Sequence, residues 1–388
     1  MNQFAAAMSL HPIASHAVGE TAGQVLDQFQ GENPDLLVVF ASPHFVGAME
    51  DVAATLRNLL DPKVLLGGTA SSIIGGSQEV EEEPALSVFA ARLPGIELTP
   101  LVLRVEDTPD GHALVGWPHA QATAHSLIMF NDPFTFPVDA FLERCNEDLP
   151  NLQVIGGMAS AARGPGGNRL VMNDTIWTEG AVGVLVEGGL EVRTVVSQGC
   201  RPIGQPFVVT RAEGNLVHEL GGQPALARLQ ELAAAASDDE RALLRQGLHL
   251  GIVVDEQQDE FGRGDFLVRN VLGGDQESGV LKVGDVVEVG QTVQFQVRDA
   301  GSADEDLRVL LARADAADGA LLFTCNGRGQ HLFGLPDHDA GLVEELLGPI
   351  PLAGAFCAGE IGPVGGRNYV HGFTASLALF GATSAVHP

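Results

Sequence analysis

The sequence predicts an α+β protein of two domains, in which mixed β-sheets are flanked by helices and part of the chain repeats a strand-helix-strand-strand unit. Three observations support this prediction. The chain has 388 residues, which is too long for one compact core. Its 48 glycines and 21 prolines are dispersed, as in proteins with many short turns between strands. Three segments of the chain also resemble one another closely enough to be aligned.

The first strand of each repeat is an apolar run with a phenylalanine, and Phe40, Phe130 and Phe323 align. Each run predicts a buried strand that ends in a turn. A segment with the spacing of an amphipathic helix follows each run. In the third repeat we expect Asp339 to cap this helix and Gly348 to end it. The apolar runs are DLLVVFASP (35–43), HSLIMFNDP (125–133) and ALLFTCNG (320–327), and the helical segments are MEDVAATLRNLL, PVDAFLERCNEDL and DAGLVEELLG.

A second apolar strand follows the helix in each repeat, and a third strand completes the unit. The recurring order of strand, helix, strand, loop and strand predicts that the first two strands lie parallel, joined by a right-handed crossover. The second-strand segments are KVLLGGTASSIIGG (63–76), LQVIGGMASAARGPGG (152–167) and IPLAGAFCAGEIGP (350–363). The third strands are PALSVFAARL, GAVGVLVEGGLEV and GFTASLALFG.

Pairs of small residues align the second strands with one another. In this alignment Cys357 takes the place of Ser71 and Ser160, so a small residue there is mainly what the sheet requires. Glu360 belongs to the third repeat alone, because its counterparts are Ile74 and Arg163. The pairs used for the alignment are Gly67-Gly68, Gly156-Gly157 and Ala353-Gly354.

A region of different character separates the second and third repeats. Ser237 with Glu240, and Ser302 with Glu305, have the spacing of a helix capping box. The composition changes near residues 213–224, which predicts a domain boundary. The first domain would then be 1–213, with two repeats, and the second 214–388, with the third repeat plus inserted hairpins and helices. The region contains the helical patterns PALARLQELAAAA, SDDERALLRQG and SADEDLRVLLARA and the strand-like runs GLHLGIVVDE, FLVRNVLGG and TVQFQVRD.

The chain is strongly acidic, with 50 acidic and 21 basic residues and a formal net charge of −29. Such a field repels phosphate backbones and anionic lipids, so we expect neither nucleic acid nor a membrane as a partner. The four cysteines include no CxxC pair, which fits a reducing cytoplasm. The N-terminal residues lack a basic segment, and no apolar stretch has the length of a membrane span. We therefore predict a cytoplasmic protein.

A candidate ligand site lies around CNGRG (325–329), where a strand ends in a turn. Asn326 offers an amide, and Arg328 offers a planar fork for a carboxylate. Glu360 follows the next strand and could meet an ammonium group, so that the two charged residues would face one crevice and bind an amino acid. The alternative is that they pair with each other or lie in solvent. The neighbouring GGRNYVHG adds Asn368, Tyr369 and His371 as candidates, although a packing role suits Tyr369 equally well.

Two further kinds of chemistry are open to these residue types. An enzyme would use Cys357 or Cys325 as nucleophile with His371 as base, oriented by Glu360, although no known nucleophile signature surrounds either cysteine. Haem would need an axial ligand in an apolar pocket, and His331 is the first choice because of its apolar neighbours. The other haem candidates are His218, His249, His338 and His371. A metal site at Asp337, His338 and Asp339 has no visible partner cluster, and a helix cap explains Asp339 better.

The motifs NDPFTFPVDAFL, VIGGMASAARGPGGNRLVMND, LLFTCNGRG and PLAGAFCAGEIGP, in this order, resemble the FIST family (F-box and intracellular signal transduction). The likeness extends from about residue 30 to the end, in the paired arrangement of a FIST domain and a FIST C-terminal domain. Neither an F-box nor an output domain is recognisable, so the chain looks like a stand-alone member. The resemblance implies a sensory domain that binds small ligands, with amino acids proposed and some bacterial relatives linked to haem-based nitric oxide sensing. It implies no agreed catalytic residues.

Together these observations favour a cytoplasmic sensor that binds an amino acid or related metabolite and signals through a separate protein partner. An enzyme is the less favoured class, represented by the Cys, His and Glu constellation. A haem-based gas sensor or a protein-binding scaffold would also fit this sequence. The cofactor, if there is one, is unknown.

Overall fold

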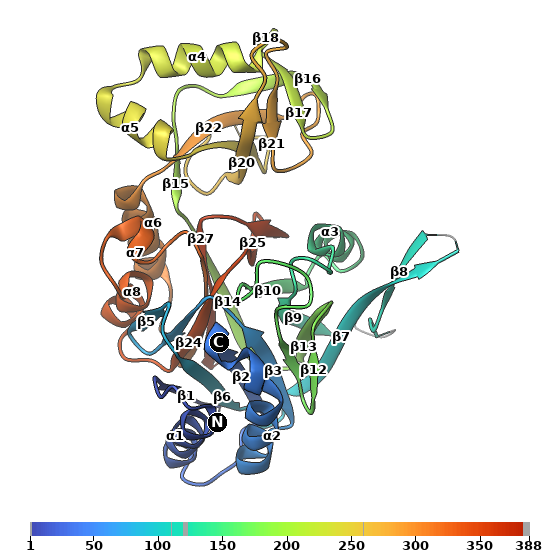
Figure 1. Cartoon of the computed structure of the whole chain (residues 1–388), viewed down its shortest axis with the longest axis vertical. Coiled ribbons are helices and arrows are strands. Elements are labelled where there is room, and N and C mark those ends of the chain that lie inside the picture. The colour runs from blue at the N-terminus through green and yellow to red at the C-terminus, as the bar shows by residue number, and fades with distance from the viewer. Residues whose placement is uncertain (1, 110, 119–122, 259, 383–388) are drawn as a thin grey trace, which may run out of the picture. The chain divides into compact units, whose positions relative to one another are not determined.

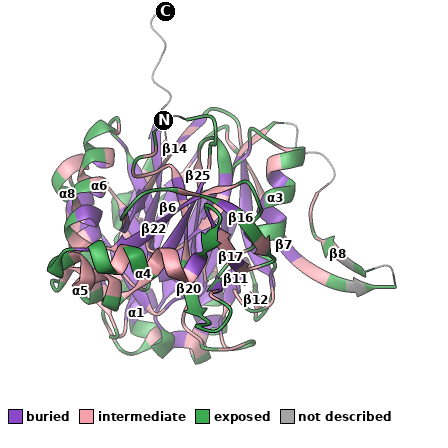
Figure 2. Cartoon of the chain, turned by 90° about the horizontal axis from the view of Figure 1, so that it is seen from above, coloured by how far each residue is buried: buried purple, intermediate pink, exposed green. Residues whose placement is uncertain are grey.

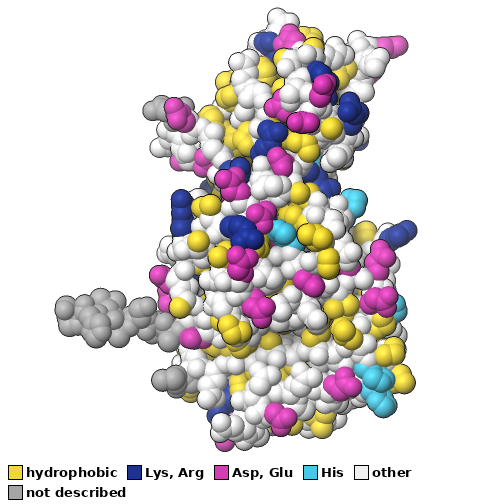
Figure 3. Space-filling model, turned by 90° about the vertical axis from the view of Figure 1, so that its left-hand side faces the viewer, with side chains coloured by type: hydrophobic (Ala, Val, Ile, Leu, Met, Phe, Trp, Pro, Cys, Tyr) yellow, Lys and Arg dark blue, Asp and Glu magenta, His cyan; other side chains and the backbone are white. Residues whose placement is uncertain are grey.

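The computed structural model describes residues 2–109, 111–118, 123–258 and 260–382 (Figure 1). Several mixed sheets, a small barrel and flanking helices confirm the predicted α+β class. Among the described residues, no helix combines the length and the apolar character that crossing a bilayer requires. On the face drawn in Figure 3, Lys and Arg side chains are scattered among Asp and Glu side chains.

Each of three sheets contains the parallel strand pair and the third strand of one repeat. The first has the strand order β1-β6-β2-β3-β11-β12, the second β7-β13-β9-β10-β25-β26 with β8 beyond β7, and the third β14-β27-β23-β24-β4-β5. The strands of the first sheet are β1 (Gln3–Ser9), β2 (Leu36–Ala41), β3 (Val64–Thr69), β6 (Leu86–Arg92), β11 (Leu170–Met172) and β12 (Thr175–Trp177). Those of the second are β7 (Glu97–Thr108), β8 (Gly111–Val115), β9 (Ala124–Asn131), β10 (Gln153–Met158), β13 (Ala181–Glu187), β25 (Glu360–Val364) and β26 (Arg367–His371). Those of the third are β4 (Ser72–Gly75), β5 (Gln78–Glu81), β14 (Leu190–Gln198), β23 (Gly319–Cys325), β24 (Leu352–Cys357) and β27 (Thr374–Ala382).

The first two strands of every repeat pair in parallel, as the sequence predicted: β2 with β3, β9 with β10, and β23 with β24. The third strand then pairs antiparallel with the first. A helix connects each parallel pair. These connecting helices are α2 (Met49–Leu60), α3 (Val138–Asp148) and α8 (His338–Leu347), with the one-turn helix η1 (Pro43–Ala48) before α2 and the short helix α7 (Gln330–Phe333) before α8.

The segment after each second strand forms a hairpin that leaves its own sheet. The β11–β12 hairpin of the second repeat extends β3 of the first sheet, and β25–β26 of the third repeat extends β10 of the second. The β4–β5 hairpin of the first repeat closes the cycle by pairing with β24. The continuous strand-like segments of the sequence are therefore divided between two sheets, and each sheet is completed by a neighbouring repeat.

The aligned phenylalanines meet in the core between the sheets. Phe40 contacts Phe130 and Phe323 with ring centroids 5.6 and 5.8 Å apart. Helices α1 (Ala14–Gln28) and α2 cover the other face of the first sheet, α3 covers the second, and α8 with α6 (Ala300–Arg313) covers the third. In Figure 2 the strands are largely buried, whereas the helices expose their outer sides.

The register corrects the alignment of the second strands by one residue. Phe40, Phe130 and Phe323 lie opposite Gly68, Gly157 and Ala355. The equivalent positions are therefore Gly67, Gly156 and Gly354, and the counterparts of Cys357 are Ala70 and Ala159 instead of Ser71 and Ser160. By the pairing of the hairpins, Glu360 corresponds to the buried residues Ile73 and Leu170. The sequence alignment was one residue out because the third repeat has alanine in place of the second glycine of the pair.

The chain divides into two compact units. Within the described residues, the large unit comprises 2–196, 307–370 and 374–382, and the small unit comprises 197–306 and 371–373. In the chain, the small unit is thus inserted after β14 and before the first strand of the third repeat. The boundary expected at residues 213 and 214 remains a prediction from sequence.

The small unit is a closed antiparallel barrel with two helices. Its ring runs β22-β16-β17-β21-β20-β19 and returns to β22. Val217, Leu250 and Phe295 belong to its apolar core. The elements are β15 (Cys200–Pro202), β16 (Phe207–Glu213), β17 (Leu216–Leu220), β18 (Gln223–Pro224), α4 (Ala225–Ala235), α5 (Asp238–Gln246), β19 (Leu248–Val253), β20 (Phe266–Gly274), β21 (Leu281–Val283) and β22 (Thr292–Arg298).

The predicted helix caps are partly confirmed. The capping box of Ser237 and Glu240 is present at the start of α5, and Gly348 follows the end of α8. The box at Ser302 is wrong, because Asp299 accepts hydrogen bonds from the N–H groups of residues 301 and 302 and α6 begins earlier. Asp339 is also not a cap: it lies inside the first turn of α8.

Candidate functional site

The carboxyl ends of the parallel strands bring together polar residues of all three repeats. Ser71 follows β3, Ser160 follows β10 and Asn326 follows β23. The Ser71 hydroxyl donates to Asn326 Oδ1 at 2.7 Å, and the Ser71 backbone N–H donates to Ser160 Oγ at 2.9 Å. The Ser160 hydroxyl in turn donates to the Phe356 carbonyl at 2.5 Å. Because Asn326 is exposed and both serines are partly exposed, these groups are accessible to a ligand.

Ser71 and Ser160 entered the sequence alignment only as counterparts of Cys357. The signal that identifies them is the repeat itself. Each of them follows the second strand of a parallel pair, where α/β folds place their binding groups. The third repeat has Ala358 at this position, so its polar contribution comes from Asn326 instead.

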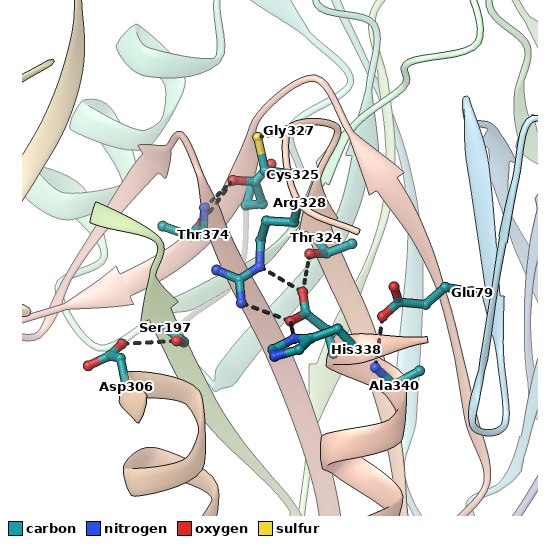
Figure 4. A network of polar contacts seen from close by, with 12 residues as sticks. Glu79, Ser197, Asp306, Thr324, Cys325, Gly327, Arg328, His338, Ala340 and Thr374 are labelled. Atoms are coloured by element: carbon teal, nitrogen blue, oxygen red, sulfur yellow. Dashed lines mark hydrogen bonds and ion pairs between the residues drawn. The ribbon is translucent and has the colours of Figure 1, made fainter. Parts of the chain in front are cut away.

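Arg328 follows Asn326 by two residues and is fully buried. Its Nε and Nη2 atoms donate to the two carboxylate oxygens of Asp339 at 2.7 and 2.8 Å (Figure 4). Burial alone would raise the pKa of Asp339, but the ion pair with Arg328 holds that pKa well below its usual range. The carboxylate that we expected a ligand to provide is therefore supplied by the protein.

Other groups complete the shell of Asp339. The Thr324 hydroxyl donates to Oδ2 at 2.7 Å, and His338 Nδ1 lies 2.9 Å from Oδ1. Glu79 from β5 of the first repeat packs nearby and accepts the Ala340 N–H at 2.9 Å. Burial, and next the charge of Asp339, raise the pKa of Glu79 to about 8. Sequence reasoning missed Glu79, because only the exchange of hairpins brings it to the third sheet.

Glu360 is also fully buried, at the start of β25. Its Oε2 atom accepts hydrogen bonds from the Thr374 N–H at 3.2 Å and the Thr374 hydroxyl at 2.8 Å, and among the described residues Oε1 has no hydrogen-bond partner. Burial raises the pKa of Glu360 to about 8, although the contacts with Thr374 and the charge of Arg328 lower it. Near neutral pH the group therefore favours its uncharged form.

The structure places four of the predicted residues near one another. Cys325, Cys357, Arg328 and Glu360 lie near enough for their charges to interact. Asn368 is instead a structural residue: its amide donates to the Leu152 carbonyl at 2.8 Å and accepts the Val154 N–H at 2.8 Å. Tyr369 is partly exposed in β26. His371 is buried and belongs to the small unit.

The two cysteines differ in their surroundings. Cys357 is fully buried, and burial, followed by the charges of Glu360 and Cys325, raises the pKa of its thiol well above the ordinary value. A thiol in that state is a poor nucleophile. Cys325 is partly exposed and its sulfur accepts the Gly327 N–H at 3.4 Å.

His331, the first choice as a haem ligand, lies in different surroundings from those that an axial ligand needs. His331 is exposed on α7, whereas an axial haem ligand lies in an apolar pocket. His338 stacks on Phe333 with ring centroids 3.3 Å apart. Within the described part of the chain, no group of three or more His, Cys, Asp or Glu side chains could hold a metal ion.

Replacing the Glu360 carboxyl by an amide should change how stability depends on pH. Between its ordinary pKa of 4.5 and about 8, folded Glu360 keeps a proton that the unfolded chain releases, so wild-type stability falls as pH rises through this window. Glu360→Gln removes this loss. We expect the stability of the variant relative to wild type to improve by more than about 1.4 kcal/mol, the equivalent of one pKa unit, between about pH 5 and pH 9. Urea unfolding at both pH values measures it.

Glu344→Gln provides the matched control, because it makes the same change from carboxyl to amide at an exposed residue of α8. A difference between Glu360→Gln and wild type that stays constant from about pH 5 to pH 9 would contradict the assignment of a buried, uncharged carboxyl.

Comparison with known proteins supports a family assignment. Residues 35–223 match the FIST N domain, and residues 225–363 match the FIST C domain. An uncharacterized protein of Mycobacterium bovis is 47% identical over 374 residues, covering 95% of this chain and 96% of the relative. One from Mycobacterium tuberculosis is 45% identical over 379 residues, covering 96% and 98%. Among solved structures, a cyanuric acid hydrolase from A. caulinodans aligns with 98% of this chain and 99% of its own at 9% identity; with a TM-score of 0.32, this likeness carries no argument.

Proposed function

The chain belongs to the FIST family, with a FIST N domain followed by a FIST C domain, and from this premise we propose that it is a sensory protein that binds a small polar ligand, an amino acid or a related metabolite. One observation carries the proposal. Side chains from three repeats, Ser71, Ser160 and Asn326, converge at the carboxyl ends of parallel strands and are in contact there.

The chemistry of these groups suits a zwitterion. Hydroxyl groups can donate to a carboxylate and accept from an ammonium group, and the Asn326 amide can do both as well. The proposal assigns first contact with the ligand to Ser71, Ser160 and Asn326. Arg328 and Glu360 are fully buried, so the proposal does not require that the ion pair between Arg328 and Asp339 opens.

A thermal-shift experiment with a panel of amino acids and related metabolites tests the proposal. A ligand at a hundredfold excess over its Kd should stabilise the protein by about 2.7 kcal/mol. Ser71→Ala and Asn326→Ala should abolish the shift, because each removes a group that contacts the ligand. Ser15→Ala in α1 is the matched control, since Ser15 is exposed and lies on a helix outside the site.

Two results would count against this function. The first is a panel in which no compound shifts the melting temperature of the wild-type protein. The second is a shift that Ser71→Ala and Asn326→Ala retain at full size, which would place the ligand elsewhere in the chain. The proposed separate signalling partner is tested next, by affinity capture with and without the active compound.

A further inference from the structure

We propose that Cys325 and Cys357 form a redox-active dithiol, in which a hydroperoxide oxidises Cys325 and Cys357 then closes an intramolecular disulfide. Nothing in this proposal depends on the ligand suggested above. It assigns a modification site to the third sheet of the large unit.

The strand register places the two cysteines side by side on adjacent strands. Cys325 is the last residue of β23, Cys357 is the last residue of β24, and the two are direct partners in the parallel ladder. Partners on adjacent strands project to the same face of a sheet, and adjacent strands lie about 4.7–4.9 Å apart. Disulfides span Cα separations of about 4.4–6.8 Å, so the register is compatible with a bond. Because both residues end their strands, the small adjustment that a bond requires is confined to strand ends.

Cys325 has the surroundings of a reacting thiol. It is partly exposed, so a small peroxide can reach the sulfur. The Gly327 N–H points at Sγ at 3.4 Å, and the Arg328 guanidinium lies near enough for its charge to interact with Cys325 (Figure 4). A hydrogen-bond donor and a cation both stabilise negative charge on sulfur, which is the reactive form.

Cys357 has the surroundings of a resolving thiol. It is fully buried, and its Sγ packs where a side chain at Gly157 would lie, since a Cβ built there would come within 2.3 Å of that sulfur. Burial shields it from direct oxidation and keeps it protonated. The sulfur that it can reach is that of its ladder partner, whose charge also affects its pKa.

The proposed reaction balances with the hydroperoxide as the only oxidant. The Cys325 thiolate attacks the peroxide, forming an S–O bond as the O–O bond breaks, and the expelled alkoxide or hydroxide takes up the proton that the Cys325 thiol released and leaves as an alcohol or water. Cys357 then attacks the Cys325 sulfur, the S–S bond forms, and the S–O bond breaks. The released hydroxide takes the proton of the Cys357 thiol and leaves as water. Two thiols are oxidised, and one hydroperoxide is reduced.

Counting free thiols after peroxide treatment of the folded protein tests the proposal directly, because the chain has four cysteines. Treatment with a small excess of hydrogen peroxide, followed by quenching and thiol titration under denaturing conditions, should reduce the count from four to two. Dithiothreitol should restore four. Peptide mass spectrometry should identify a single disulfide that joins Cys325 to Cys357 within one chain.

Variants separate the two roles. Cys357→Ser should leave Cys325 as a sulfenic acid that dimedone traps, whereas Cys325→Ser should lose no thiol under the same treatment. Cys145→Ser and Cys200→Ser are the controls: both cysteines are buried elsewhere, so these variants should form the disulfide as wild type does. The proposal is overturned if folded wild-type protein keeps four thiols, or if the disulfide contains Cys145 or Cys200 or joins two chains.

Discussion

Asp339→Asn should destabilise the protein by about 3–5 kcal/mol, because it leaves the charge of Arg328 buried without a counter-ion. Both side chains are inaccessible to solvent, with exposed fractions of 0% for Arg328 and 1% for Asp339. The guanidinium uses two N–H groups on the carboxylate, and an amide can accept only one of these hydrogen bonds well. Thr324 and His338 cannot replace a negative charge, and Glu79, the other carboxyl of this shell, favours its uncharged form near neutral pH because its pKa is raised to about 8.

Guanidinium chloride unfolding of wild type and variant measures this loss. The control is the ion pair between Arg308 and Glu345, whose side chains are 42% and 55% exposed. Glu345→Gln should cost about 0–1 kcal/mol, since water and salt screen such pairs. If Asp339→Asn costs no more than Glu345→Gln, the buried pair does not stabilise the fold to the extent expected.

The repeat was predictable because its strands and helices are marked by the regular spacing of apolar residues. The buried strands β2, β9 and β23 and the helices after them appear in the sequence with a common phenylalanine. The exchange of hairpins was not predictable, because β3 and β4 follow each other in one continuous stretch of small and apolar residues around GGTASS, with no turn signal between them. Nothing in a run of small and apolar residues shows that the strand changes sheets near Ser71. That choice depends on pairing with β24, about 280 residues later in the chain, and such distant pairing leaves no local signal.

The sequence predicted which residues near the strand ends carry polar or charged groups, but not the contacts that these groups make. The turn after β23 and the charged residues near it were found from residue type and strand-end position. The roles of these residues were not predictable. The sequence does not show that Asp339 lies inside the first turn of α8 and binds Arg328 instead of capping the helix. It also does not show that Glu360 takes the position of the buried Ile73 and Leu170 of the other repeats. The side chains that we place closest to a ligand, Ser71 and Ser160, are ordinary in type. They stand out only when three repeats are superposed and their strand ends meet.

The cyclic exchange has a consequence for cooperativity. Each sheet of the large unit holds strands of two repeats, so no repeat can complete its sheet alone. The contacts of Ser71 with Ser160 and Asn326 therefore exist only when all three repeats are folded. A ligand at these strand ends, as proposed above, would stabilise the three repeats together and would so couple local binding to the stability of the whole unit.

Gly156→Ala should destabilise the protein by more than about 4 kcal/mol, the range in which single substitutions are exceptional. A Cβ at Gly156 would lie 1.8 Å from the Met129 carbonyl oxygen of the parallel partner strand. The same close approach recurs at Gly67, 1.9 Å from the Val39 oxygen, and at Gly354, 2.0 Å from the Leu322 oxygen. The obstacle in each case is backbone, which cannot move aside without breaking the parallel ladder.

Chemical unfolding, or the yield of soluble folded protein where the variant does not fold, measures this effect. Gly23→Ala in α1 is the matched control, because apart from its chain neighbours and the backbone of its own helix no described atom lies within 4 Å of its added Cβ, and the helix should gain about 0.5–1 kcal/mol. A Gly156→Ala variant that unfolds at the wild-type midpoint would show that the strands can separate at little cost. Equal losses at Gly67, Gly156 and Gly354 would instead show that the three repeats share one packing requirement at the point where each parallel pair is closest.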